Sequence, residues 1–261
     1  MPRVRLDSLL AERGLYPSRS RAAAAVLAGE VRLGDGRALK PGQQVDPSVE
    51  LVVDAPPPFV SRGGVKLANA LDALGVRVEG RSCLDVGAST GGFTDCLLQR
   101  GAARVIALDV AYGELDWRLR SDPRVTVLER VNARSIGELP YAPSVIVADV
   151  SFISLRKVLP SVLGAAADEF DCLAMVKPQF EVGRERVGKG GVVRDPALRR
   201  EAVRDVALAA RELGAAVMGF ASSGLPGPAG NLETFVWLAE GSRPGALEPD
   251  ALMPLIEEAG A

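Results

Sequence analysis

The chain has 261 residues, of which 48% are hydrophobic and 25% are charged. This length allows a sizeable core and exceeds the commonest domain size, so we expect one large domain and one small one. The sequence has no histidine, and its three cysteines form no C-x-x-C pair. This pattern argues against the usual zinc sites and favours a reducing, cytoplasmic setting. We therefore expect no metal site.

Composition also constrains partners and mechanism. Because histidine is absent, a general base near neutral pH must be a lysine, a carboxylate, a tyrosine or a cysteine. The net charge of −2 and the pI near 5.5 argue against a polycationic nucleic-acid coat, although a binding face needs only local positive charge. The N-terminus shows no signal pattern, and the apolar run 22–28 is far too short to cross a bilayer. We expect no membrane role, and a monomer.

The N-terminal segment predicts a small module of two helices followed by strands. Leucines at helical spacing predict a first helix that stops at Gly14, and a second helix is predicted over 19–28. Two β-like stretches follow, at 31–33 and 50–53. Residues 1–53 hold eight basic and six acidic side chains, and five of the eight lie within the first 21 residues. The excess of positive charge is small but concentrated on the predicted helices.

This pattern of helix, helix, strand and turn resembles the RNA-binding domain named after ribosomal protein S-four. The segments that carry the resemblance are 5–10, 18–22, 28–32 and 40–42. The resemblance implies that basic residues bind folded RNA, and the alternative is a small α+β cap with a solvated charged face. The residues assigned to RNA are Arg3, Arg5, Arg19, Arg21 and, beyond this module, Arg62.

Residues 54–60 predict a stiff, proline-rich linker, and the larger domain is expected over 61–240. Apolar stretches there alternate with helical patterns, which predicts βαβ units and a mostly parallel sheet covered on both faces. The predicted strands are 82–86, 104–109, 125–128, 145–149 and 172–177. Two more strands, 216–221 and 234–238, are expected to pair antiparallel and complete a seven-stranded sheet. The segment 241–261 is either a short helix or a frayed end.

A ligand site is predicted at Leu84-Asp-Val-Gly-Ala-Ser-Thr-Gly-Gly-Phe-Thr94. Here a buried-type strand runs through a glycine-rich turn into a helix, and ligands of open α/β sheets bind at such strand ends. Asp109 ends the next strand, where its carboxylate could bind both hydroxyls of a ribose, or could instead cap a helix. A domain that binds a nicotinamide dinucleotide would have the same loop and the same acidic residue. S-adenosylmethionine is favoured because its charged groups suit a loop that begins at Asp85, and because the fourth strand ends in Asp149.

Lys177 directly follows the apolar run of the fifth strand. A lysine there is either a snorkelling surface residue or a half-buried functional one. Half-burial disfavours the ammonium form, and with no histidine in the chain the functional interpretation is favoured. Lys66 on a helix and Glu233 at the start of the last strand have ordinary alternatives, a solvated lysine and an exposed carboxylate.

Six sequence blocks together are similar to the TlyA family of ribosomal RNA 2′-O-methyltransferases, within the FtsJ-like group. The blocks are 60–67, 84–94, 149–155, 176–183, 190–196 and 225–231. The resemblance implies a Rossmann-like class I methyltransferase fold with a small N-terminal α+β RNA-binding domain. It also implies S-adenosylmethionine as cofactor and a cytidine of small- or large-subunit ribosomal RNA, or both, as substrate. The residues assigned to the cofactor are Asp85, Gly87, Ala88, Ser89, Thr90, Gly91, Gly92, Phe93, Asp109, Asn132 and Asp149.

The FtsJ-like enzymes use a Lys-Asp-Lys-Glu tetrad, which matches Lys66, Asp149, Lys177 and Glu233. In the resulting hypothesis Lys177 accepts the proton of the 2′-hydroxyl and Lys66 stabilises the developing alkoxide, while the two carboxylates orient the lysines. No Asn/Asp-Pro-Pro-Tyr/Phe tetrad or Pro-Cys pair is present, which favours ribose over a base as methyl acceptor.

Two alternatives stay open at the level of sequence. A nicotinamide-dependent oxidoreductase would share the first βαβ unit, but would leave the N-terminal basic module and the Lys177 block unexplained. The second alternative is a non-enzymatic protein, either an RNA-binding protein or a cytolysin, because some members of the family carry a hemolysin label. No long apolar segment or strongly basic amphipathic helix supports direct membrane lysis.

Overall fold

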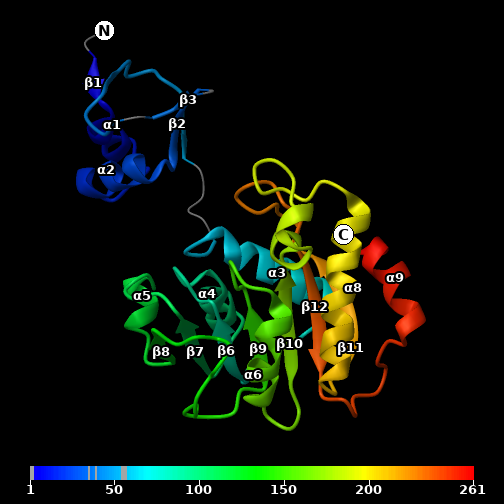
Figure 1. The fold of residues 1–261 in the computed structure, drawn as a ribbon. Helices are drawn as coiled ribbons and strands as arrows, with labels where there is room; N and C mark the ends of the chain where they lie inside the picture. Colours follow the sequence, from blue (N-terminus) through cyan, green and yellow to red (C-terminus); the bar gives the residue numbers. More distant parts are fainter. Residues whose placement is uncertain (1–2, 35, 39, 54–57) are drawn as a thin grey trace. The chain divides into compact units, whose positions relative to one another are not determined.

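The computed structural model describes residues 3–34, 36–38, 40–53 and 58–261, which form two compact units (Figure 1). The first unit is Met1–Pro58 and the second is Phe59–Ala261. The proline-rich part of the predicted linker, 54–57, lies outside the described residues. Immediately after it the chain packs in the second unit, where the backbone N–H of Val60 donates to the carboxylate of Asp95 at 2.8 Å.

The described residues of the first unit form two helices and five short strands. They are β1 (Val4–Arg5), α1 (Leu6–Glu12), α2 (Arg19–Ala28), β2 (Val31–Leu33), β3 (Gly36–Arg37), β4 (Gln44–Val45) and β5 (Leu51–Val53). Ser18 caps α2 by accepting a hydrogen bond from the backbone of Arg21, and Gly29 ends the helix in the left-handed conformation. Strands of two residues, such as β1, β3 and β4, are too short to show any periodicity, so the sequence did not predict them.

A seven-stranded sheet forms the centre of the second unit, in the order β11-β12-β10-β9-β6-β7-β8. Its strands are β6 (Ser82–Val86), β7 (Arg104–Asp109), β8 (Val125–Glu129), β9 (Val145–Ala148), β10 (Asp171–Val176), β11 (Ala216–Ser222) and β12 (Thr234–Ala239). Strands β6 to β10 run parallel, whereas β12 pairs antiparallel with both β10 and β11. The expected α/β fold with a mostly parallel sheet and an antiparallel closing pair is confirmed.

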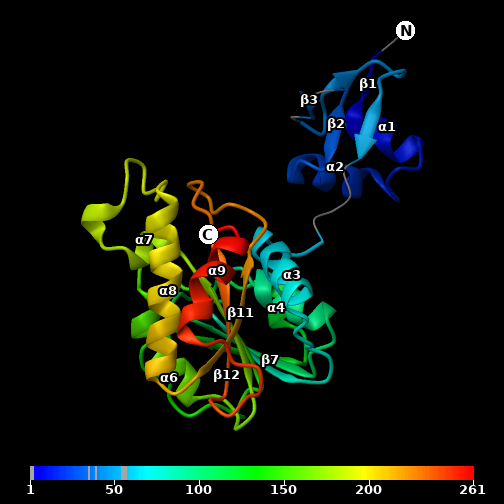
Figure 2. The same cartoon turned by 90° about the vertical axis from the view of Figure 1, so that its right-hand side faces the viewer.

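Helices cover both faces of this sheet (Figure 2). They are α3 (Arg62–Leu74), α4 (Gly92–Gln99), α5 (Trp117–Arg120), α6 (Leu159–Gly164), α7 (Pro178–Glu181), α8 (Pro196–Glu212) and α9 (Pro249–Glu258), with short 3-10 turns η1 (Leu155–Lys157) and η2 (Arg184–Arg186). Residues of α6, α8 and α9 share one hydrophobic cluster, and residues of α3, α4 and α5 share a second. Among the helices of the described residues, none is long and apolar enough to span a membrane.

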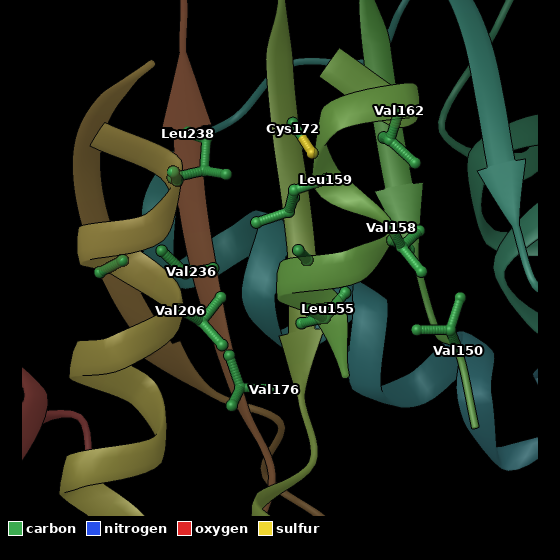
Figure 3. Close-up of a cluster of buried hydrophobic side chains, with 14 of the residues drawn as sticks. Val150, Leu155, Val158, Leu159, Val162, Cys172, Val176, Val206, Val236 and Leu238 are labelled. Atoms are coloured by element: carbon green, nitrogen blue, oxygen red, sulfur yellow. The ribbon is translucent and has the colours of Figure 1, made fainter. Parts of the chain in front are cut away.

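Alternating side chains of each strand enter these two clusters, which explains the continuous apolar runs of the sequence. On β10, Cys172 and Val176 belong to the cluster under α6 and α8, whereas Leu173 and Met175 belong to the cluster under α3 and α4. Figure 3 shows the first of these clusters, with Val206 of α8 among the side chains that cover β10 and β12.

The C-terminal segment is a helix rather than a frayed end. Leu252 and Ile256 of α9 are fully buried or nearly so, and both belong to the cluster that includes α8. Their spacing of four residues places both side chains on one face of the helix, which is what fixes α9 to the domain.

Candidate active site

Strand register brings the predicted catalytic residues to one edge of the sheet. The carboxyl ends of parallel strands meet at one edge, and Asp149 directly follows β9 while Lys177 directly follows β10. Because β12 is antiparallel to β10 and Thr234 lies opposite Val176, Glu233 reaches the same edge. Three side chains that are far apart in the sequence therefore meet through pairing alone.

The four residues of the expected tetrad line one cavity of about 550 Å³. Lys66 is 7% exposed and forms an ion pair with Glu233, which is 2% exposed. Lys177 forms the second pair, with 2.5 Å between its Nζ and Oδ1 of Asp149. The ordinary alternatives of a solvated lysine and an exposed carboxylate do not apply, because both members of the first pair are buried. The cavity thus holds two cations balanced by two anions.

Three further residues beside the tetrad were not predicted. Ser151 accepts a hydrogen bond of 2.7 Å from Lys177, and Phe152 is 92% exposed with a left-handed φ of 64°. Glu181 is buried, which raises the pKa of its carboxyl group. All three lie inside the sequence blocks 149–155 and 176–183 that carried the resemblance. Their chemistry depends on neighbours from other strands, so the sequence alone gave them no role.

Glu181 connects the two loops that carry the second ion pair. Its carboxylate accepts hydrogen bonds from Oγ of Ser154 at 2.6 Å and from the backbone N–H of Leu155 at 2.7 Å. Since Glu181 lies at the end of α7, four residues after Lys177, these bonds fix the loop after β9 to the loop after β10.

A second cavity, of about 470 Å³, adjoins the first and shares part of its lining with it. The shared residues are Gly87, Ser89, Asp149 and Ser151. Asp109 and Asn132 give this cavity a carboxylate and an amide, and Val110, Val131 and Ile153 give it apolar surface. A polar end that can bind hydroxyls and an apolar wall that can bind an aromatic base are what a nucleoside requires.

Asp109 is held by the glycine-rich loop itself. Its two oxygens accept hydrogen bonds from the backbone N–H groups of Ser89 at 2.7 Å and Ala111 at 2.8 Å. No helix begins at this residue, because the next one is α5 at Trp117. Asp109 is therefore not a helix cap, and each carboxylate oxygen keeps a second lone pair for a ligand hydroxyl.

Gly87 makes the contact between the loop and the neighbouring strand possible. Its φ is +86°, and a Cβ atom there would lie 2.5 Å from the carbonyl oxygen of Asp149. Only glycine allows this close approach, which leaves the backbone of the loop open to both cavities. The loop, the carboxylate of Asp109 and the apolar wall together fit the methionine and adenosine parts of S-adenosylmethionine.

Two residues assigned to the cofactor line neither cavity. Asp85 is fully buried, and its Oδ2 accepts a hydrogen bond of 2.7 Å from Thr94, whereas its Oδ1 has no partner among the described residues. Burial, together with the negative charges of Asp149 and Asp109, raises the pKa of Asp85 to about 7. At Gly91 a Cβ atom would lie 2.2 Å from the side chain of Leu119, so this glycine serves packing.

The other residues assigned to the cofactor lie at the cavities. They are Gly87, Ala88, Ser89, Thr90, Gly92, Phe93 and Asp149 at the first cavity, with Asp109 and Asn132 at the second. Phe93 is only 3% exposed and packs 5.9 Å from the ring of Phe235, so most of its surface belongs to the core. In the described ranges of the chain, no group of acidic or cysteine side chains has the arrangement of a metal site.

In the first unit, the four arginines assigned to RNA are exposed. They are Arg3, Arg5, Arg19 and Arg21. Asp7, whose side chain is 4% exposed, forms ion pairs with Arg5 at 2.7 Å and Arg19 at 3.2 Å. Hydrogen bonds from Arg5 lower the pKa of Asp7 to about 2. One buried carboxylate thus holds the guanidinium group of Arg5, at the end of β1, beside that of Arg19 on α2.

Arg62 belongs to the second unit and lines the cavity of the tetrad. Its Nη2 donates a hydrogen bond of 2.9 Å to the carbonyl oxygen of Pro226. This contact fixes the guanidinium group at the rim formed by the loop that leads to Glu233. The structure thus places Arg62 at the cavity of the tetrad, and its contact with RNA stays a prediction.

Comparison with known proteins matches both units. The family model of the FtsJ-like methyltransferases matches residues 59–240, and that of the S4 domain matches residues 4–51. The chain belongs to the FtsJ-like methyltransferases. This match confirms the resemblance on which the tetrad was assigned. The matched residues include the glycine-rich loop 84–94.

Individual relatives of this FtsJ-like methyltransferase cover nearly the whole chain. It is 52% identical over 240 residues, 90% of each chain, to the 16S/23S rRNA (cytidine-2′-O)-methyltransferase TlyA of Mycobacterium tuberculosis. It is 42% identical to the protein YqxC of Bacillus subtilis, a candidate rRNA methyltransferase, over 98% of this chain and 93% of that one. A solved structure from Streptococcus thermophilus, described as a candidate hemolysin, has a TM-score of 0.75 and 37% identity, and covers 100% of this chain and 96% of that one.

Proposed function

We propose that this protein transfers a methyl group from S-adenosylmethionine to the ribose 2′-hydroxyl of a cytidine in ribosomal RNA. The observation that carries the proposal is the cavity in which Lys177 and Lys66 are each paired with a carboxylate, next to a cavity suited to a nucleoside. A ribose hydroxyl is a weak acid and needs a base during attack, and this chain offers no histidine for the task. We extend the proposal to action in the cytoplasm on ribosomal subunits.

When bound, S-adenosylmethionine supplies a methyl group made electrophilic by its sulfonium. In the proposed mechanism Lys177, as the neutral amine, accepts the proton of the 2′-hydroxyl at its Nζ, and Asp149 holds that nitrogen in place at 2.5 Å. Lys66 stays charged beside Glu233 and stabilises the oxygen as negative charge develops on it.

The cofactor residues act by orientation in this proposal. The carboxylate of Asp109 binds the ribose hydroxyls of the cofactor with the lone pairs that the loop leaves free, and Asn132 borders the same cavity. The open backbone at Gly87 lets the ligand approach both cavities at once. Such fixed placement of two reactants converts a bimolecular step into an effectively unimolecular one, which is where much of the rate enhancement arises.

Recognition of folded RNA is assigned to the first unit. Arg5 and Arg19 keep exposed guanidinium groups while Asp7 orients them, and such groups suit the phosphate oxygens of an RNA backbone. Phosphate contacts position an RNA without reading its sequence. Selection of one cytidine then depends on the shape of the RNA and on the cavity of the second unit.

The test is methylation of isolated ribosomal subunits with tritium-labelled S-adenosylmethionine, followed by mapping of the blocked 2′-position. Lys177→Ala is expected to lower turnover by at least about a hundredfold, because a general base contributes about 10² to 10⁴. Binding of S-adenosylhomocysteine, measured by calorimetry, should stay within about threefold of the wild type, since Lys177 acts on the acceptor. The matched control is Lys157→Ala, which removes a lysine outside this cavity. Near-normal turnover of Lys177→Ala would remove Lys177 as the base.

The same calorimetry separates the competing functions. A nicotinamide-dependent oxidoreductase would bind NAD more tightly than S-adenosylhomocysteine, and the opposite order is expected here. The hemolysin description of a related structure suggests a cytolytic role as a second candidate. No observation on the described residues favours that role. Release of hemoglobin from erythrocytes by the purified protein, at concentrations that saturate methylation, would be needed to support that role.

A further inference from the structure

Ser151 is the second partner of the proposed base. Nζ of Lys177 lies 2.5 Å from Oδ1 of Asp149 and donates a hydrogen bond of 2.7 Å to Oγ of Ser151. Ser151 follows Asp149 by two residues, on the loop after β9, and it lines the same cavity as the tetrad. Among the described residues Nζ has no third partner. Oδ1 of Asp149 accepts no hydrogen bond from the described residues, so Ser151 is the hydrogen-bond acceptor of Nζ and Asp149 is its ion-pair partner.

These two contacts determine where a lone pair can point. A neutral lysine amine has two N–H groups and one lone pair in a tetrahedral arrangement. If one N–H donates to Ser151, the other N–H and not the lone pair faces the carboxylate of Asp149, because the lone pair and the anion repel each other. The lone pair then takes the remaining direction. With Asp149 as the sole partner, the amine could rotate about that single contact, and the lone pair would be spread over two directions.

We propose that Ser151 is a positioning residue, which orients the lone pair of Lys177 toward the 2′-hydroxyl of the substrate. This inference rests on the proposed function, because it needs Lys177 to act as the base. It adds a fifth residue to the set of Lys66, Asp149, Lys177 and Glu233, with a role that none of those four can take over. Asp149 fixes the distance of the amine, and Ser151 fixes its rotation.

Ser151 is exposed, but the loop that carries it is anchored on both sides, which fixes the backbone from which its hydroxyl reaches Lys177. On one side Val150 is 7% exposed and enters the hydrophobic cluster under α6 (Figure 3). On the other side Ser154 donates to the buried carboxylate of Glu181 at 2.6 Å, and Leu155 is buried in the same cluster. A side chain on an anchored backbone reaches its partner from a defined position, which is what orientation of a catalytic group requires.

The test compares Ser151→Ala with Ser151→Thr in the full-length protein, using steady-state methylation of ribosomal subunits. Ser151→Ala should lower kcat about tenfold to a hundredfold, the effect of misplacing a reacting group by about 1 Å. The KM values for RNA and for S-adenosylmethionine should stay within about twofold, because Lys177 and not the ligands loses its partner. Ser151→Thr keeps a hydroxyl and should restore at least half of the wild-type kcat. The control Ser121→Ala removes a hydroxyl that donates to the backbone of Trp117, and should leave kcat unchanged.

Folding of each variant is checked by thermal melting and by calorimetry with S-adenosylhomocysteine, which should match the wild type. A wild-type kcat for Ser151→Ala overturns the inference, as does a rise in KM at constant kcat, which would mean that the serine binds substrate. Failure of Ser151→Thr to restore kcat while it melts and binds normally also overturns it. The proposed function fails separately, when Lys177→Ala stays active. An inactive Lys177→Ala combined with a fully active Ser151→Ala rejects only the role of Ser151.

Discussion

Asp85→Asn should make the protein more stable at alkaline pH, because the carboxylate it replaces is buried without full compensation. Asp85 is 0% exposed, its Oδ2 has one donor in Thr94, and its Oδ1 has none among the described residues. Burial is the main cause that raises its pKa from 3.8 to about 7, with smaller contributions from Asp149 and Asp109. Ionised Asp85 therefore destabilises the folded state relative to the unfolded chain.

The sign and size follow from proton linkage. Between pH 3.8 and 7 the folded protein holds a proton on Asp85 that the unfolded chain has lost, so the free energy of unfolding falls as pH rises and levels off above pH 7. At about 1.4 kcal/mol for each unit of pKa, the full shift corresponds to roughly 4 kcal/mol, of which about 3 kcal/mol falls between pH 5 and pH 8. Asp85→Asn cannot ionise and removes this dependence.

Urea denaturation of wild type and Asp85→Asn at pH 5, 6, 7 and 8 measures the effect. The difference in unfolding free energy should move in favour of Asp85→Asn by about 3 kcal/mol over this range. Asp72→Asn is the control, because Arg100 lowers the pKa of Asp72 below its ordinary range and no titration of it falls between pH 5 and 8. A difference that stays constant within about 1 kcal/mol from pH 5 to pH 8 would mean that Asp85 does not carry a raised pKa in the folded protein.

Three other substitutions or reagents test the site and the core. Lys66→Met should lower the free energy of unfolding, measured by urea denaturation, by about 3–5 kcal/mol, because it leaves Glu233 buried and unpaired. The double variant Lys66→Met/Glu233→Leu should regain most of that stability but should not methylate RNA. Gly87→Ala should bind S-adenosylhomocysteine more weakly in calorimetry and melt at a lower temperature, because its Cβ would lie 2.5 Å from the carbonyl oxygen of Asp149. The control Gly164→Ala has open space around the new Cβ and should behave as the wild type. Burial raises the pKa of the thiols of Cys83, Cys96 and Cys172 to about 12. At pH 8 a thiol reagent should therefore label the native protein slowly and the urea-unfolded chain rapidly. Fast labelling of the native protein would contradict the burial of these cysteines.

Local patterns of residues were enough to predict several parts of this protein. The apolar runs of β6 to β10 predicted parallel strands, because a strand buried on both faces needs hydrophobic side chains at every position. Ser18 and Gly29 marked the ends of α2, since capping chemistry depends only on adjacent backbone. The Lys177 block and the glycine-rich loop were found because strand ends of such sheets carry ligands.

Which of these residues act together depends on how the folded chain packs. Burial of Lys66 and its pairing with Glu233 depend on α3 packing beside β11, next to the loop that leads into β12, which no local pattern reveals. Ser151 became significant only because β9 and β10 are neighbours, which brings its hydroxyl to Lys177. Conversely, Asp85 has the sequence position of a cofactor ligand but lies beneath the cavities, bonded to Thr94. The physical reason is that side-chain contact and dielectric environment are set by neighbours distant in the chain, whereas propensity and periodicity report only on neighbours along it.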